Sequence, residues 1–313
     1  MEEIMKVFSR KPIKSPPQEN SVSKEMLRNA GMKKILSLCF VFAMICGFAD
    51  PPQSIILESG NVRIRLDGRK RWNINRIEWK NHLLGVDLEG AHYGVVYRPA
   101  DSKFHIGSGH DESGVGEKLL TLKIFADHKE VIPAEGKIIK GDVIRIERTS
   151  QIADIASKTS LVIENDILRE TTEISAEKDV KMNYLYFFMH PWSTRFDKYH
   201  AIRPNGDKID VTFKSDKSFP NRKFVPSVAV YETKTGLGAA TFIRNIKGKK
   251  APSRFIWDCP VYRKDYLCDY FRSTLPAGKP VIYEAVTGFF RQPENDKWIA
   301  EAESLLKKLA GDK

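Results

Sequence analysis

The sequence predicts an all-β protein, a large antiparallel β-sandwich that ends in a single helix. Between residues 55 and 290, short apolar or alternating runs follow one another, separated by turn signals such as Ser59-Gly60 and Asp67-Gly68. Residues 293–313 show a different period, that of a helix with one apolar stripe. The stripe consists of Trp298, Ala302, Leu305, Leu306 and Leu309.

The expected strands follow the chain in order. Residues 160–164 and 167–174 alternate apolar with polar residues around Asn165-Asp166, which predicts a hairpin with a tight polar turn. Residues 184–189 form an aromatic and apolar run typical of a strand in a packed sheet. The other expected strands are 55–57, 62–66, 93–97, 119–125, 137–139, 143–148, 211–213, 227–231, 239–243, 255–257, 268–274 and 281–290.

The first 49 residues are expected to lie outside this domain. Lys33-Lys34, an apolar run over 35–48 and Ala49 have the pattern of a signal peptide, which we place at 32–49. The run is shorter than the roughly 20 residues that span a bilayer, so no stable membrane span is expected after cleavage. Residues 1–31 are expected to be disordered, or to precede a true start at Met32.

The predicted organisation is therefore a β-sandwich over 50–292 with residues 293–313 packed on it as a helix, in a protein exported to the periplasm or beyond. The chain has 51 basic and 40 acidic residues, a net charge of +11. An exported protein has little access to nucleic acid, so an acidic oligo- or polysaccharide is the expected partner. A surplus spread evenly over the surface would serve only solubility.

Two cysteines, Cys259 and Cys268, lie in the predicted mature domain. In an oxidising compartment they are expected to form a disulfide across a hairpin, and two buried thiols are the alternative. No Cys/His spacing indicates structural zinc.

A first group of candidate site residues follows the strand at 184–189. His190, Trp192, Arg195, Tyr199 and His200 occur within eleven positions of one another. They combine groups for proton transfer, positive charge and aromatic surface, which a carbohydrate site requires. We therefore predict His190 and Tyr199 as catalytic, and Trp192, Arg195 and His200 as substrate-binding. Arg203 lies nearby in the sequence and is expected, with Arg195, to bind a carboxylate or sulfate.

A second group lies in a glycine-rich loop at 104–116, which carries His105, His110, Asp111 and Glu112. We predict that the loop brings His110, as a catalytic group, opposite His190, with His105 as a substrate-binding residue. The alternative is a flexible hairpin loop. No cofactor is expected, and a divalent metal in this loop stays open although the spacing fits no standard zinc pattern.

The block 161–194 resembles the central part of the galactose mutarotase (aldose 1-epimerase) family. There, a hairpin rich in Thr and Glu leads into an apolar strand with a His-x-aromatic motif, as in Glu170-Thr171-Thr172-Glu173 and His190-Pro191-Trp192 here. The resemblance implies a β-supersandwich and gives His190 the family's acid-base position. By position alone, Glu284 corresponds to the late catalytic glutamate, whereas Met189 replaces the family's usual Asn.

The fold implied by this resemblance is shared by mutarotases, polysaccharide lyase domains and non-catalytic modules. The leading hypothesis is a lyase that cleaves a uronate-containing polysaccharide by acid-base β-elimination, with His190 or His110 as base, Arg195 neutralising the carboxylate and Tyr199 as acid. One alternative is a mutarotase-like or epimerase-like enzyme on free sugars. The other is a non-catalytic carbohydrate-binding protein.

Overall fold

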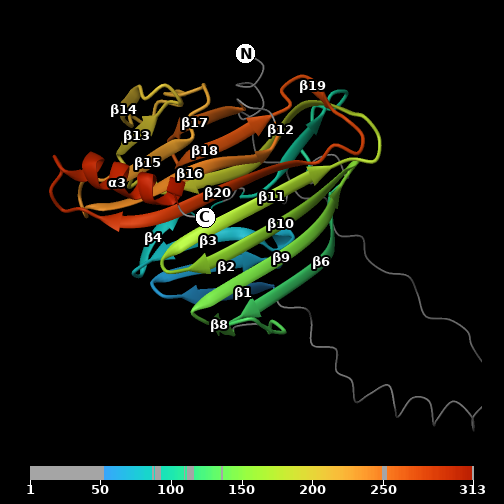
Figure 1. Cartoon of the computed structure of the whole chain (residues 1–313), viewed down its shortest axis with the longest axis horizontal. Coiled ribbons are helices and arrows are strands. Elements are labelled where there is room, and N and C mark those ends of the chain that lie inside the picture. Colours follow the sequence, from blue (N-terminus) through green and yellow to red (C-terminus); the bar gives the residue numbers. More distant parts are fainter. Residues whose placement is uncertain are drawn as a thin grey trace, which may run out of the picture. The chain divides into compact units, whose positions relative to one another are not determined.

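The computed structural model describes residues 53–86, 88, 93–108, 110, 116–134, 137–248 and 252–311. The predicted signal peptide at 32–49 and the segment before it lie outside the described residues. Pro51–Lys313 form one compact unit. Two ten-stranded sheets and one helix confirm the all-β prediction (Figure 1). Within the described ranges, no helix has the length and apolar character needed to cross a bilayer.

The first sheet is built around the long strand β12 (Val180–Trp192). Its order is β17 (Ser253–Cys259), β18 (Tyr262–Asp269), β12, β4 (His82–Gly85), β3 (Asn73–Trp79), β2 (Val62–Asp67), β1 (Ser54–Ser59) and β8 (Ile138–Lys140). Two further strands pair with β12, namely β5 (Val96–Pro99) and β19 (Ser273–Leu275). A short 3-10 turn, η1 (Gly68–Lys70), joins β2 to β3.

The second sheet contains the predicted hairpin. Its order is β14 (Lys208–Thr212), β13 (Lys198–Ile202), β15 (Ser227–Glu232), β16 (Leu237–Lys247), β20 (Val281–Arg291), β11 (Ile167–Ser175), β10 (Ile155–Glu164), β9 (Val143–Ile152), β6 (Glu117–Ala126) and β7 (Lys129–Glu130). Asn165 and Asp166 form the β10–β11 turn with φ values of 52° and 62°, as a tight hairpin turn requires. Tyr199 and His200 lie on β13, a strand that was not among those expected from the sequence.

The two sheets pack face to face through alternating side chains. Along β11 every second residue is buried, which is the pattern of a strand with one face in a core. The largest apolar cluster contains Ile64 and Trp79 from the first sheet together with Leu168 and Phe289 from the second. The Asp166 carboxylate adds a polar link between the sheets, because it accepts hydrogen bonds from Asn61 at 2.7 and 2.8 Å and from the Trp79 indole at 3.2 Å.

The single helix in the described part of the chain, α3 (Trp298–Gly311), covers part of the outer face of the second sheet. It contacts β15, β16 and β20 (Figure 1). Trp298, Ala302, Leu306 and Leu309 are buried, as the helical stripe predicts. The Trp298 ring stacks on Tyr231 with a centroid distance of 4.9 Å.

A β-bulge in β12 decides which way its side chains point. The pairing with β18 shifts between Tyr186 and Phe188. Before the bulge, Leu185 faces the sandwich core and Tyr186 faces outward; after it, Phe188 faces the core and Met189 packs with Tyr186. Because one extra residue reverses the alternation, His190 points in the opposite direction from Tyr186.

The predicted disulfide is wrong, because Cys259 and Cys268 are both buried free thiols. Cys259 lies opposite Tyr262 in the β17–β18 hairpin, and Cys268 lies opposite Ser253, six residues farther along β18. At about 3.3 Å per residue the two cysteines are about 20 Å apart along the strand. A disulfide needs Cα atoms within about 7 Å.

We expect both thiols to react with an alkylating reagent when the protein is unfolded without reductant, and neither to react rapidly in the native state. Mass spectrometry of the peptides that contain Cys259 and Cys268 measures this directly. Recovery of the two peptides as one cross-linked species would contradict the register of the β17–β18 hairpin.

Candidate active site

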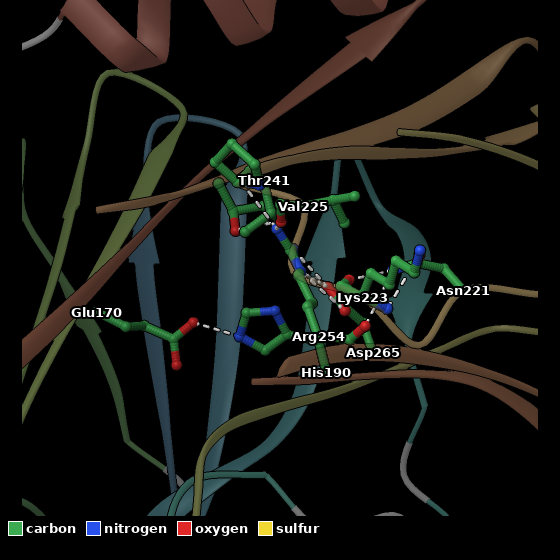
Figure 2. Close-up of polar contacts among 10 residues, drawn as sticks. Glu170, His190, Asn221, Lys223, Val225, Thr241, Arg254 and Asp265 are labelled. Atoms are coloured by element: carbon green, nitrogen blue, oxygen red, sulfur yellow. Dashed lines mark hydrogen bonds and ion pairs between the residues drawn. The ribbon is translucent and has the colours of Figure 1, made fainter. Parts of the chain in front are cut away.

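His190 forms a buried ion pair with Glu170 that joins the two sheets. His190 lies on β12 of the first sheet and Glu170 on β11 of the second. The His190 Nε2 and Glu170 Oε2 atoms are 2.6 Å apart, and the His190 side chain is 3% exposed (Figure 2). Burial alone would lower the pKa of His190, but the charge and hydrogen bond of Glu170, helped by Asp265, raise it above its ordinary value.

A second buried ion pair lies beside the first. Asp265 on β18 is the cross-strand neighbour of His190, and its carboxylate is 2.6 Å from an Arg254 guanidinium nitrogen. Arg254 also donates to the carbonyls of Val225 at 3.2 Å and Pro226 at 2.9 Å (Figure 2). The guanidinium therefore joins β17 and β18 to the segment before β15 in the second sheet.

The surroundings of His190 favour a structural role over a catalytic one. The cavity that Glu170 and Phe188 help to line has a volume of about 50 Å³, too small for a sugar. Tyr199 is 1% exposed, and its pKa is raised by burial and by the charge of Asp265, so it is a poor proton donor at neutral pH. Trp192 is in the core, with its ring 5.5 Å from His190.

Glu284 lies on the helix side of the second sheet, away from His190. Its carboxylate accepts hydrogen bonds from Arg244 at 2.8 Å and Arg169 at 3.2 Å. Arg244 also donates to the carbonyl of Leu309 at 3.1 Å. Glu284 is thus part of the anchor that holds the end of α3, and the structure does not bring it together with His190.

His200 lies in a second anchor of the same helix. Its Nδ1 is 2.6 Å from Asp210 on β14, and its Nε2 is 3.1 Å from Glu303 on α3, although the second contact lacks hydrogen-bonding geometry. The imidazole is fully buried and meets the Trp298 ring edge-on at 6.1 Å. This environment indicates a role in docking the helix.

The two predicted arginines bind carboxylates of the protein itself. Arg195 Nε donates to Glu232 at 2.9 Å, and Arg203 is 3.6 Å from Asp207. Arg195 is half-exposed at the surface, whereas His190 and Tyr199 are buried between the sheets. The three groups required for elimination therefore do not share an open site.

The structure does bring together His105, His110 and Tyr184. The Tyr184 hydroxyl is hydrogen-bonded to His105 Nε2, and the ring centroids of these two residues are 5.5 Å apart. The His105 and His110 centroids are 5.3 Å apart, and both imidazoles are partly exposed. This cluster lies on the outer face of the first sheet, so His110 and His190 are on opposite faces of that sheet.

Contacts with β5 and β6 hold the loop that carries the two histidines. Ile106 forms a bridge with Tyr97 on β5, and Gly107, with a φ of +99°, allows the turn that returns at His110. The Ser108 amide donates to Glu117 at 2.9 Å, and Glu117 is itself in a buried ion pair with Arg148 at 2.6 Å. These contacts hold the residues on either side of the turn against β5 and β6. Asp111 and Glu112 lie outside the described residues.

Aromatic rings continue from this cluster across β12 and β18. Tyr184 and Tyr186 have centroids 4.9 Å apart, and Tyr186 and Tyr266 are 5.1 Å apart. Lys264 Nζ lies 5.3 Å from the Tyr266 ring centroid, and burial lowers the pKa of Lys264 to about 7. We call His110, His105, Tyr184, Tyr186, Tyr266 and Lys264 the aromatic strip.

Sequence reasoning found the two histidines of the strip but missed its other members. Tyr184 and Tyr186 had a signal, their i, i+2 spacing, which places both rings on one face of a strand. Lys264 and Tyr266 share that spacing on β18. Across the described part of the chain, no three His, Cys, Asp or Glu side chains are grouped closely enough to hold a metal ion.

The chain resembles known proteins in its three-dimensional structure but not detectably in its sequence. No protein-family model matches the chain, and no curated protein matches it. Among solved structures, the Slr1438 protein from Synechocystis sp. PCC 6803 has a TM-score of 0.50 at 9% identity, covering 78% of this chain and 97% of that one. A candidate aldose 1-epimerase from Klebsiella pneumoniae has a TM-score of 0.50 at 10% identity, covering 80% of this chain and 82% of that one.

A galactose mutarotase-like protein from Lactobacillus casei is also similar, with a TM-score of 0.44 at 9% identity over 76% of this chain and all of that one. Identities this low show the fold alone. The galactose mutarotase-like fold expected from the block 161–194 is thereby confirmed.

We expect Glu170→Ala to destabilise the protein by about 3–5 kcal/mol at pH 6, because it leaves His190 buried without its partner. The pKa of His190 is raised in the folded state, so the stabilisation by the pair is complete below the unfolded pKa and is lost as the pH rises through the folded one. The cost of the substitution should therefore be smaller at pH 9. Urea unfolding at both pH values measures it.

Glu173→Ala is the matched control. Glu173 lies on the same strand in a surface pair with Lys158 at 3.5 Å, and such pairs contribute about 1 kcal/mol or less. Equal losses for the two variants, or a cost for Glu170→Ala that does not depend on pH, would show that the buried pair does not stabilise the fold as described.

Proposed function

We propose that this protein is a mutarotase-like or epimerase-like enzyme that acts on free sugars at the aromatic strip. The observation that carries the proposal is the cluster of His105, His110 and Tyr184. Two partly exposed imidazoles, with ring centroids 5.3 Å apart, lie at the end of a row of aromatic rings. Imidazole is the side chain best suited to exchange protons near neutral pH.

Interconversion of anomers needs one base and one acid. The base takes the proton from the anomeric hydroxyl while the acid gives a proton to the ring oxygen, so the bond between the anomeric carbon and the ring oxygen breaks and an aldehyde forms. Rotation of the aldehyde and the reverse transfers close the ring as the other anomer. Centroids of His105 and His110 at 5.3 Å leave the two imidazoles able to flank these adjacent oxygens.

Two tyrosines of the strip and a neighbouring arginine fit roles in holding the sugar. Tyr184 fixes the orientation of the His105 ring through their hydrogen bond. Tyr186 is partly exposed beside it and offers a flat surface for the apolar face of a pyranose. Arg98, whose guanidinium lies 5.6 Å from the Tyr184 ring centroid, supplies hydrogen-bond donors for hydroxyl groups.

A lyase that cleaves a uronate-containing polysaccharide by elimination is the second candidate function. It requires the base, the acid and the neutralising cation to meet at one carboxylate, and His190, Tyr199 and Arg195 are distributed between the core and the surface. A protein that binds sugar on the strip without catalysis is the third reading. Export to the periplasm or beyond remains our proposal from the pattern of residues 32–49.

We expect the full-length protein to accelerate the anomeric equilibration of freshly dissolved aldoses, followed by polarimetry. His105→Ala should reduce the rate constant by about 100-fold or more, because general acid-base groups contribute about 10²- to 10⁴-fold. Tyr184→Phe should cause a smaller loss, since it removes only the group that orients His105. The matched control is His128→Ala, an exposed histidine in the β6–β7 turn, which should leave the rate unchanged.

Measurements of sugar binding and of elimination distinguish the three candidate functions. If the protein does not accelerate equilibration but binds sugars with a dependence on His105, it is a binding protein and the catalytic proposal fails. A rise in absorbance near 235 nm with acidic polysaccharides would instead establish the lyase. If the protein shows no catalysis and no sugar binding that depends on the strip, a carbohydrate role for this face is refuted.

A further inference from the structure

A second cavity lies apart from the aromatic strip. It has a volume of about 310 Å³ and lies where His82 at the start of β4, the turn of residues 233–237 between β15 and β16, and Arg291 at the end of β20 come together. Leu237 and Pro293 give it an apolar wall. Its volume is at the lower end of the range of small-molecule sites, which fits a ligand of monosaccharide size.

The titratable side chains that line this cavity are all basic. His82, Lys234 and Arg291 contribute to the lining, and it contains no Asp or Glu among the described residues. All three are exposed. None of them makes an ion pair with another residue in the described ranges, whereas Arg195, Arg203 and Arg254 each pair with a carboxylate. Unpaired cations around one concavity attract an anionic ligand.

Two carboxylates near the cavity accept hydrogen bonds from residues of the protein. Asp197 accepts hydrogen bonds from the Thr233 amide at 2.8 Å and from the Thr233 hydroxyl at 2.6 Å. Glu232 is 5% exposed and accepts from Thr235 at 2.6 Å and from Arg195 at 2.9 Å. Both carboxylates already accept hydrogen bonds from these donors. The two carboxylates therefore do not compete with a ligand for the basic side chains of the cavity.

Gly236 fixes the shape of this turn. Its φ is +72°, and a Cβ atom at this position would lie 2.6 Å from the Gln292 carbonyl oxygen, so only glycine fits. The Gln292 amide donates to the Gly236 carbonyl at 2.7 Å, which joins the turn to the segment after β20. Lys234 and Arg291 are therefore presented by two segments that are bonded to each other, as a preorganised site requires.

We propose that this cavity, which we call the basic pocket, binds a small organic anion of monosaccharide size through a carboxylate or phosphate group. Lys234 and Arg291 supply the charge and donors for the anionic group, and His82 supplies a further imidazole donor. The basic pocket is independent of the proposed acid-base chemistry at the strip. It would give the protein a binding site for acidic or phosphorylated sugars in addition to a site for neutral ones.

Amide chemical shifts of the full-length ¹⁵N-labelled protein test the proposal, with titration of inorganic phosphate, glucuronate, glucose 6-phosphate and glucose. The three anions should shift the amides of residues 233–237, and glucose should not. Comparison of glucuronate with glucose 6-phosphate identifies the preferred group. Lys234→Ala and Arg291→Ala should each weaken anion binding by about tenfold or more, and added salt should weaken it further.

Two control variants locate the site. Lys279→Ala removes an exposed lysine just before β20, at the opposite end of that strand from Arg291, and should leave the affinity unchanged. His105→Ala should also leave it unchanged, because His105 belongs to the aromatic strip. The proposal is overturned if the anions do not shift residues 233–237, if glucose shifts them equally, or if Lys279→Ala weakens binding as much as Lys234→Ala. Loss of anion binding in His105→Ala would assign the anions to the strip and refute the basic pocket.

Discussion

The β-bulge in β12 is the constraint on which the placement of the candidate site depends. Strict alternation along this strand would place Tyr184, Tyr186 and His190 on the same face. The shift in pairing between Tyr186 and Phe188 instead sends His190 into the space between the sheets. The inserted residue reverses which alternate positions face outward, so that Tyr184 and Tyr186 face outward before the bulge and His190 faces inward after it. Bulges are the usual device by which sheets re-aim a side chain in this way.

The inward-facing histidine belongs to a set of polar contacts between or across the layers. His190 and Glu170 join the sheets, Arg254 and Asp265 join β17 and β18 to the second sheet, and Glu284 helps to hold α3. Each buried charge has lost its hydration, so each is tolerated only with its partner in place. These contacts therefore specify how the layers align more than they add to stability, because apolar side chains of similar volume would fill the same space at no electrostatic cost.

The fold was predictable because it depends on local patterns. Alternation over 160–174 gave the hairpin, and the stripe from Trp298 to Leu309 gave the helix. The site was less predictable, since it depends on register and on long-range pairing. Nothing in the spacing of His190, Tyr199 and His200 signals the bulge in β12 or the extra strand β13, and these two features direct the three side chains into the core or under α3. The prediction of a disulfide was wrong for the same reason. The nine-residue separation of Cys259 and Cys268 does not reveal which residues of the hairpin lie opposite each other.

The distribution of buried and covered surfaces explains why the outer face of the first sheet is the place to look for chemistry. Apolar side chains and ion pairs fill the interior, where the cavity beside Glu170 holds about 50 Å³. Helix α3 covers β15, β16 and β20 on the outer face of the second sheet. The outer face of the first sheet carries a smaller buried cluster that includes Met189 and Tyr266, and next to it Tyr186, His105 and His110 remain partly exposed. Strand β12 thus buries His190 between the sheets and carries Tyr184 and Tyr186 on its other face, where Tyr184 is buried beneath the loop histidines and Tyr186, His105 and His110 are partly exposed.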